Sequence, residues 1–180
     1  MKKFLFVSIV AVTVMVLGIG SAFAATTTGT SLKAGTFGFN VGFGDSSLGN
    51  TGVIMISGKY FLANDVALIA GLGFQASSGD QDANYFGISA GVRKYLRIDE
   101  FAPFVEGRFS YINENIDVDN IDRDTFDVSA LFGAEYFLNR QFSIEGSVGL
   151  GFGSVNDNIS HNDYTYFGSR TVGISANFYF

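Results

Sequence analysis

The sequence contains no cysteine, no tryptophan, one proline and one histidine. An exported chain without cysteine relies on its sheet for stability rather than on disulfide bridges. After the first 24 residues, no apolar run approaches the roughly 18 residues that suggest a membrane-spanning helix. The formal net charge of −6 argues against a nucleic-acid partner. Glycine (23) and phenylalanine (20) are abundant and spread along the chain, so the pattern of hydrophobicity has to be examined.

The first 24 residues have the three parts of a secretory signal peptide. Lys2 and Lys3 supply the positive region, an apolar run extends from Phe4 to Leu17, and small residues near Ala24 suit a cleavage site. We predict a cleavable Sec-type signal peptide at 1–24 and one mature domain at 25–180. Loss of the two lysines changes the net charge from −6 to −8. An uncleaved N-terminal anchor helix remains the alternative.

From residue 34 onward, apolar residues recur at every second position, which indicates β-strands. Along the segment Phe142–Gly153, large apolar side chains alternate with Gly, Ser and Glu. Eight such segments are predicted, at residues 34–44, 51–62, 66–76, 84–96, 102–112, 125–138, 142–153 and 165–180. The connections alternate between short ones and longer ones rich in Asp, Asn, Ser and Gly. This organisation is typical of an antiparallel up-and-down meander.

The two faces of the predicted strands differ in side-chain size. The polar face is mostly Gly and Ser, which fits the crowded interior of a narrow barrel, whereas the apolar face is bulky and requires lipid. A membrane-spanning strand needs roughly 9–11 residues, and every backbone group must pair without an open edge. We therefore predict an all-β fold, an eight-stranded antiparallel transmembrane β-barrel. Tyr60, Tyr136 and Phe180 are expected in one aromatic girdle, and Tyr166 in the other.

The C-terminal alternation Ile174-x-Ala176-x-Phe178-x-Phe180 resembles the terminal signature of a family of outer-membrane β-barrels. That family includes the transmembrane domain of outer membrane protein A, outer membrane protein X and the opacity-type surface proteins. The resemblance covers 25–180 and implies location in the bacterial outer membrane, with both termini and the short turns in the periplasm. It also implies contact with outer-membrane lipid and lipopolysaccharide, and recognition of these four residues by the outer-membrane assembly machinery.

Seven charged residues fall on the inward face of the predicted strands: Lys59, Arg93, Glu106, Arg108, Asp127, Glu135 and Glu145. The interior of an eight-stranded barrel is just wide enough for side chains to fill it, so buried charges must be paired. Glu135 and Glu145 flank a short turn and are expected on opposite sides of one strand pair, where they need cations. Two interpretations remain open, a structural polar core and an ion path gated by rearranging pairs.

Two of the longer connections carry possible chemistry. Residues 113–124 read NENIDVDNIDRD, but they lack the glycine and the spacing of a calcium-binding EF-hand loop. We expect a solvated acidic loop, with weak binding of divalent cations near lipopolysaccharide phosphates as the alternative. His161 lies near Ser160, Asp157 and Asp163 in a single loop. Catalytic groups usually converge from several elements, so this arrangement disfavours an enzyme.

No catalytic, cofactor-binding or metal site is predicted. The sequence favours a small, monomeric, non-enzymatic outer-membrane protein that supports envelope integrity or contacts an external protein or host surface through its acidic loops. A narrow porin-like ion channel through the charged lumen is the first alternative. An outer-membrane enzyme and a soluble periplasmic binding protein, with its apolar face turned inward, are weaker alternatives.

Overall fold

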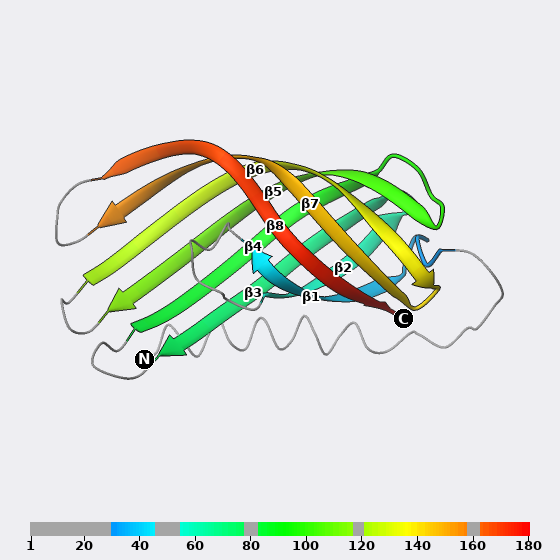
Figure 1. Cartoon of the computed structure of the whole chain (residues 1–180), viewed down its shortest axis with the longest axis horizontal. Helices are drawn as coiled ribbons and strands as arrows, with labels where there is room; N and C mark the ends of the chain where they lie inside the picture. Colours follow the sequence, from blue (N-terminus) through cyan, green and yellow to red (C-terminus); the bar gives the residue numbers. More distant parts are fainter. Residues whose placement is uncertain (1–29, 46–54, 78–82, 117–120, 158–162) are drawn as a thin grey trace.

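A computed structural model describes residues 30–45, 55–77, 83–116, 121–157 and 163–180, and these form a closed barrel (Figure 1). The strands are β1 (Phe37–Asp45), β2 (Met55–Ala63), β3 (Val66–Ser77), β4 (Ala83–Tyr95), β5 (Phe101–Ile116), β6 (Ile121–Asn139), β7 (Phe142–Asp157) and β8 (Tyr164–Tyr179). Each strand pairs antiparallel with the next, and β8 pairs with β1. The predicted eight-stranded antiparallel up-and-down barrel is confirmed. The predicted signal peptide lies outside the described residues.

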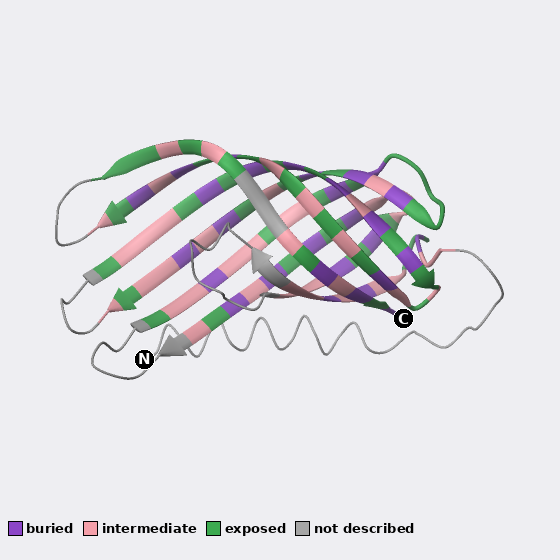
Figure 2. Ribbon diagram, in the orientation of Figure 1, coloured by how far each residue is buried: buried purple, intermediate pink, exposed green. Residues whose placement is uncertain are grey.

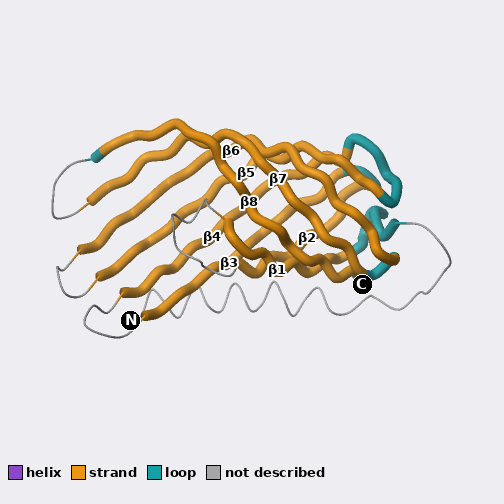
Figure 3. Tube along the Cα trace, in the orientation of Figure 1, coloured by secondary structure: helices purple, strands orange, loops and turns teal. Residues whose placement is uncertain are grey.

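The two ends of the barrel differ in their connections. At one end, which we call the short-turn end, β2 turns into β3, β4 into β5 and β6 into β7 through the turns drawn as loop in Figure 3. The C-terminus lies at the same end (Figure 1). At the other end, the long-loop end, β1, β3, β5 and β7 end and β2, β4, β6 and β8 begin. Residues 46–54, 78–82, 117–120 and 158–162 lie outside the described residues. In the described part of the chain, no helix is long and apolar enough to cross a membrane.

Burial alternates along the strands with the polarity of a membrane barrel (Figure 2). Large apolar side chains point outward, and Phe74, for example, is 76 % exposed. Charged side chains point inward, so that Arg93 is only 1 % exposed and Glu135 is fully buried. A soluble protein would show the reverse distribution, because burial of charge and exposure of apolar surface are both unfavourable in water. The outward face of this barrel is therefore suited to lipid.

Strands β5 and β6 extend further toward the long-loop end than predicted. Asn113 pairs with Asp124 and Asn115 pairs with Asp122, and the ladder continues as far as Ile116 and Ile121. The prediction of a solvated loop over 113–124 is therefore wrong in its extent. In this part of the hairpin both faces carry polar residues, so apolar and polar positions no longer alternate. Prediction from hydrophobic alternation therefore ends the two strands too early, although their hydrogen-bonded pairing continues.

A β-bulge in β8 changes which residues face inward. Gly146 pairs with Ile174 and Ser147 with Val172, which leaves Gly173 as an extra residue. A bulge of one residue exchanges the two faces of the strand beyond it. Tyr166 consequently turns into the lumen, where its hydroxyl donates a hydrogen bond of 2.9 Å to Asp127. The prediction that Tyr166 belongs to the outer girdle is wrong for this reason.

Two tyrosines pack over glycines on neighbouring strands inside the barrel. Tyr179 lies beside Gly38, where an added Cβ would approach the tyrosine ring to 2.6 Å, and Tyr166 covers Gly153 in the same way. A large ring beside a glycine fills the narrow lumen without steric conflict between strands. The inward glycines of the sequence thus provide the room for the aromatic side chains of the core.

Candidate functional site in the barrel lumen

Six of the seven predicted inward charges lie together in one group, which we call the ionic cluster: Lys59, Arg93, Glu106, Arg108, Glu135 and Glu145. They come from β2, β4, β5, β6 and β7, so they are brought together only when the barrel closes. The seventh, Asp127, lies nearer the long-loop end and accepts its hydrogen bond from Tyr166. The cluster contains three cations and three carboxylates, and its formal charges balance.

The carboxylate of Glu145 forms ion pairs with both a lysine and an arginine. Its Oε2 atom lies 2.6 Å from Lys59 Nζ and 2.6 Å from Arg93 Nη1, while its Oε1 atom lies 3.1 Å from Arg93 Nη2. The side-chain amides of Asn40 and Asn177 donate to the same carboxylate at 3.4 and 3.3 Å. Charge-assisted bonds of this kind are the strong ones, so Glu145 is the centre of the cluster.

Glu135 and Glu145 stand directly opposite each other in the β6–β7 ladder. Two like charges in such a position are unfavourable, but Lys59 bridges them, with its Nζ atom 3.1 Å from Glu135 and 2.6 Å from Glu145. Glu135 also accepts hydrogen bonds from Ser143 and from the hydroxyls of Tyr95 and Tyr179. Two adjacent carboxylates are thereby held in a buried site without uncompensated charge.

Arg93 extends the ionic cluster to strands β4 and β5. It pairs with Glu106, its direct neighbour in register, at 2.7 Å, and Arg108 binds the other oxygen of Glu106 at 2.6 Å. The Arg93 guanidinium also lies 3.6 Å from the centre of the Phe104 ring. Arg93 therefore combines bidentate pairing with a cation–π contact, which a lysine cannot reproduce.

An aromatic layer closes the lumen between the ionic cluster and the short-turn end. This aromatic floor consists of Phe61, Tyr95, Phe104, Phe137 and Tyr179, all with exposures of 4 % or less. The rings contact one another, for example Phe61 and Tyr95 with centroids 5.8 Å apart. The hydroxyls of Tyr95 and Tyr179 reach up to Glu135, so the ionic and aromatic layers form a continuous plug.

Leu32, in the segment before β1, completes the plug at the short-turn end, and the sequence analysis did not identify it. Its side chain is 2 % exposed and packs within the buried aromatic group. The segment is held by a bond of 2.8 Å from Gly35 N to Phe61 O, and Gly35 adopts a positive φ of 84°. Glycine tolerates this conformation. No periodic signal precedes β1, so only the fold reveals this contact.

Replacing Leu32 by Ala should loosen the segment before β1. Large-to-small changes at buried leucines cost about 2–5 kcal/mol, and a chain end loses this energy by local opening. We expect the Gly35 amide to exchange its hydrogen faster, whereas amides in β5 and β6 exchange as before. Hydrogen-exchange mass spectrometry measures both, with Leu62→Ala, at an outward position, as the control. Unchanged exchange at Gly35 would contradict a sealing role for Leu32.

The long-loop end carries a separate polar group. Arg123 pairs with Glu114 at 3.0 Å and with Asp157 at 3.3 Å, and Asn113 donates to Asp122 and Asp124 at 2.9 and 3.1 Å. These residues tie the ends of β5, β6 and β7 together. Within the described ranges, no three His, Cys, Asp or Glu side chains are arranged to hold a metal ion. Ser160 and His161 of the disfavoured catalytic set lie outside the described residues.

The C-terminal residues of the predicted assembly signal lie on the outer wall. Ile174, Phe178 and Phe180 are exposed, Ala176 is half-buried, and the intervening Tyr179 belongs to the aromatic floor. Tyr60 and Tyr136 are also exposed near the short-turn end. The last strand therefore presents an apolar stripe to the outside and a packed residue to the core.

One family model and several solved structures are similar to this chain. The sequence matches the family described as "Outer membrane protein beta-barrel domain" over residues 9–180. A search of curated proteins finds no match. Among solved structures, the chain is similar to the N-terminal β-barrel domain of Pseudomonas aeruginosa OprF (15 % identity, TM-score 0.49, 85 % of this chain and 100 % of that one). It is also similar to Neisserial surface protein A (13 % identity, TM-score 0.48, 79 % and 93 %) and to Ail, the attachment invasion locus protein of Yersinia pestis (12 % identity, TM-score 0.42, 82 % and 99 %).

Proposed function

Because this chain belongs to the family of outer membrane protein β-barrel domains and is a protein of the bacterial outer membrane, we propose that it acts there as a closed, non-conducting barrel. Its role is structural or adhesive and not enzymatic. It supports the integrity of the envelope, and its long-loop end contacts external partners. Each barrel is complete on its own, since no strand edge of β1 or β8 is left open where the two strands pair.

The observation that carries this proposal is the two-layered plug. Lys59, Arg93 and Glu135 are each at most 1 % exposed, and every one of them is paired within the ionic cluster. An ion crossing the lumen would have to separate these pairs, and breaking one buried pair costs about 3–5 kcal/mol. Below the ionic cluster it would meet the aromatic floor and Leu32. A closed lumen is the arrangement expected of a barrel whose function lies at its surfaces.

Two surfaces support the proposed contacts. The described long-loop end carries Glu114, Asp122, Asp124 and Asp157 around a single Arg123, which suits a partner with a cationic surface, or a divalent cation shared with lipopolysaccharide phosphates. At the opposite end, the outward stripe of Ile174, Ala176, Phe178 and Phe180 suits recognition by the assembly machinery. Outer-membrane lipid covers the remaining apolar wall.

A narrow ion channel is the second candidate, and the connectivity of the ionic cluster favours it. Lys59 contacts two carboxylates, and Arg93 lies within 4 Å of three. A cation with several acceptors can exchange one for another without passing through an unpaired state. Rearrangement of these pairs would be the gating step.

Single-channel conductance in a planar bilayer distinguishes the two candidates. The refolded wild-type protein should show no steady conductance, because the plug leaves no continuous path for ions. The variant Glu135→Gln/Glu145→Gln, which keeps side-chain size but removes two charges, tests whether these residues close the lumen. Asp99→Asn/Glu100→Gln, which changes two exposed carboxylates in a short turn, is the matched control. Regular conductance steps in the wild type that change in the lumen variant but not in the control would overturn the closed-barrel proposal.

A further inference from the structure

The outer wall of the barrel has a groove where its side chains become small. On β2, β3 and β4, Gly58, Ala70 and Ala90 are successive neighbours in register and face outward. Beyond Ala90 the small residues continue in the next row, because Ala90 pairs with Phe109 and Gly107 pairs with Val92. Gly107 and Ala130 are direct neighbours in that row, and nothing lies within 4 Å of a Cβ added at Gly107. These five residues form the floor of the groove.

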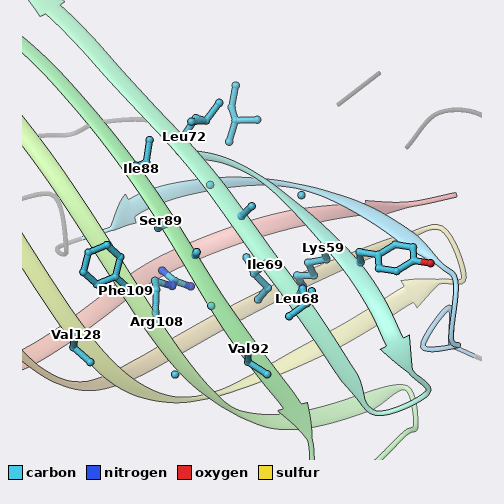
Figure 4. A pocket seen from close by; sticks show the side chains of 18 of the residues that line it. Lys59, Leu68, Ile69, Leu72, Ile88, Ser89, Val92, Arg108, Phe109 and Val128 are labelled. Atoms are coloured by element: carbon cyan, nitrogen blue, oxygen red, sulfur yellow. The ribbon is translucent and has the colours of Figure 1, made fainter. Parts of the chain in front are cut away.

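Large apolar side chains border the groove on both sides. Leu72, Ile88 and Phe109 stand along one side, and Leu68 and Val92 along the other (Figure 4). The hollow over β2 to β5 has a volume of about 980 Å³, and a second hollow of about 790 Å³ extends from β4 to β8. The two share Val92 and Gly107. A long, narrow, apolar groove therefore crosses this side of the barrel, and at β7 it is bordered by the large side chains of Val148 and Leu150.

The length of the groove matches one lipid chain. Neighbouring strands are about 4.8 Å apart, so the floor spans roughly 19 Å from Gly58 to Ala130. Half of the hydrocarbon core of a bilayer is about 15 Å thick, and strands cross it at about 45°. The groove, which runs across the strands, is inclined to the membrane plane by a similar angle. An acyl chain of one leaflet can therefore lie along its full length, whereas the convex wall of a second barrel would leave it unfilled.

A pair of opposite charges stands beside the groove at the short-turn end. Lys94 follows Val92 on the same outward face, borders the second hollow, and pairs with Asp65 in the β2–β3 turn. The two side chains are 51 % and 37 % exposed. Exposed pairs of this kind contribute little to stability, so each partner remains available to another ion. The hydrogen bond from Lys94 lowers the pKa of the Asp65 carboxyl, which is therefore ionised at neutral pH.

We propose that this groove binds one zwitterionic glycerophospholipid from the leaflet at the short-turn end. One acyl chain lies over the five small residues of the floor. The phosphate of the headgroup meets Lys94, and its ammonium group meets Asp65. The proposal goes beyond the structural role and does not depend on whether the lumen conducts, because the groove lies on the outer wall and the ionic cluster on the inner one.

The absence of tryptophan provides a direct test, because one introduced tryptophan reports on a single place. Phe109→Trp sets the reporter at the edge of the groove. Phe152→Trp sets it in the same ladder row two strands away, outside the groove. Each protein is refolded into phosphatidylglycerol bilayers that contain increasing fractions of dibrominated phosphatidylethanolamine, whose bromine atoms quench tryptophan fluorescence on contact. At low fractions of brominated lipid, we expect about threefold more quenching in Phe109→Trp, the excess that a modest binding preference produces.

Variants of the groove test whether the excess quenching of Phe109→Trp arises from the proposed lipid contacts. In the Phe109→Trp background, Ala90→Leu fills the floor and should abolish the excess quenching. Ala134→Leu, which adds the same bulk on the outer wall of β6 outside both hollows, should leave it unchanged. Lys94→Gln should reduce the excess while quenching at high fractions of brominated lipid stays the same. The mobility of unheated samples on gels verifies that each variant is folded.

Two results would overturn the proposal. Identical quenching curves for the two reporters would mean that the groove contacts only bulk lipid. Weaker quenching at Phe109→Trp than at Phe152→Trp, together with cross-linked dimers, would mean that a second copy of the chain covers the groove.

Discussion

Replacement of Arg93 by Met is expected to destabilise the folded barrel by about 3–5 kcal/mol, the cost of removing one partner from a buried ion pair. Arg93 is 1 % exposed and lies within 4 Å of Glu106, Glu135 and Glu145. Methionine fills part of the space, but it leaves three carboxylates facing only Lys59 and Arg108. Urea-induced unfolding of the protein in lipid vesicles, followed by circular dichroism and gel mobility, measures the change in the free energy of unfolding.

Two further variants separate charge imbalance from loss of packing. Arg97→Met removes a cation that is 65 % exposed and pairs with Asp99 in a turn, so its effect should stay within about 0.5 kcal/mol. Arg93→Met/Glu145→Gln restores the charge balance of the ionic cluster and should recover part of the lost stability, a coupling that a double-mutant cycle quantifies. Equal stability of Arg93→Met and Arg97→Met would show that the cluster contributes nothing to folding.

Replacement of Gly133 by Val is also expected to lower the free energy of unfolding strongly, because the lumen has no room for a side chain at this position. An added Cβ would lie 2.5 Å from Phe104 Cζ, 2.5 Å from the carbonyl oxygen of Gly146 and 2.6 Å from Ser147 Cβ. The carbonyl belongs to the β7 backbone, and Ser147 Cβ is bonded directly to that backbone, so neither can move without opening the ladder with β6. Overpacking of a close-packed interior costs about 1–3 kcal/mol and sometimes more. We expect a lower free energy of unfolding and a lower yield of folded barrel from urea.

Gly107→Val is the matched control, since Gly107 lies on the adjacent strand β5 but faces outward with nothing within 4 Å of an added Cβ. Valine suits an exposed strand position in lipid, so stability should be unchanged or slightly raised. If the two valine variants unfold at the same urea concentration, the lumen has room for a side chain at Gly133, and the steric argument is wrong.

The strands were predictable because their alternation follows from one physical constraint, a wall with lipid on one side and packed side chains on the other. Strands β3 and β7 begin at Val66 and Phe142, where the pattern predicts them. The pattern failed where that constraint ends. Beyond Ile112 the β5–β6 hairpin is polar on both faces, and at Gly173 a bulge exchanges the faces, which turned Tyr166 inward.

The lumen shows the same division between local and long-range information. Period two was sufficient to predict which charges point inward, because a side chain's face depends only on its own strand. It did not indicate that Lys59 bridges Glu135 and Glu145, or that Arg93 stacks on Phe104. Those contacts join residues that lie up to 86 positions apart in the sequence, as Lys59 and Glu145 do. They depend on the register of every strand between them, which single-strand patterns do not contain.

Composition and alternation were thus enough for the fold class, the membrane location and the inward charges, since these depend on the average environment of each face. Closure of the barrel decided the rest. It sets which cation meets which carboxylate, it brings Leu32 under the aromatic floor, and it brings small residues of five strands, in two adjacent rows, into one groove. Each of these features needs several strands at a defined stagger, and stagger is a property of the closed sheet rather than of any one segment.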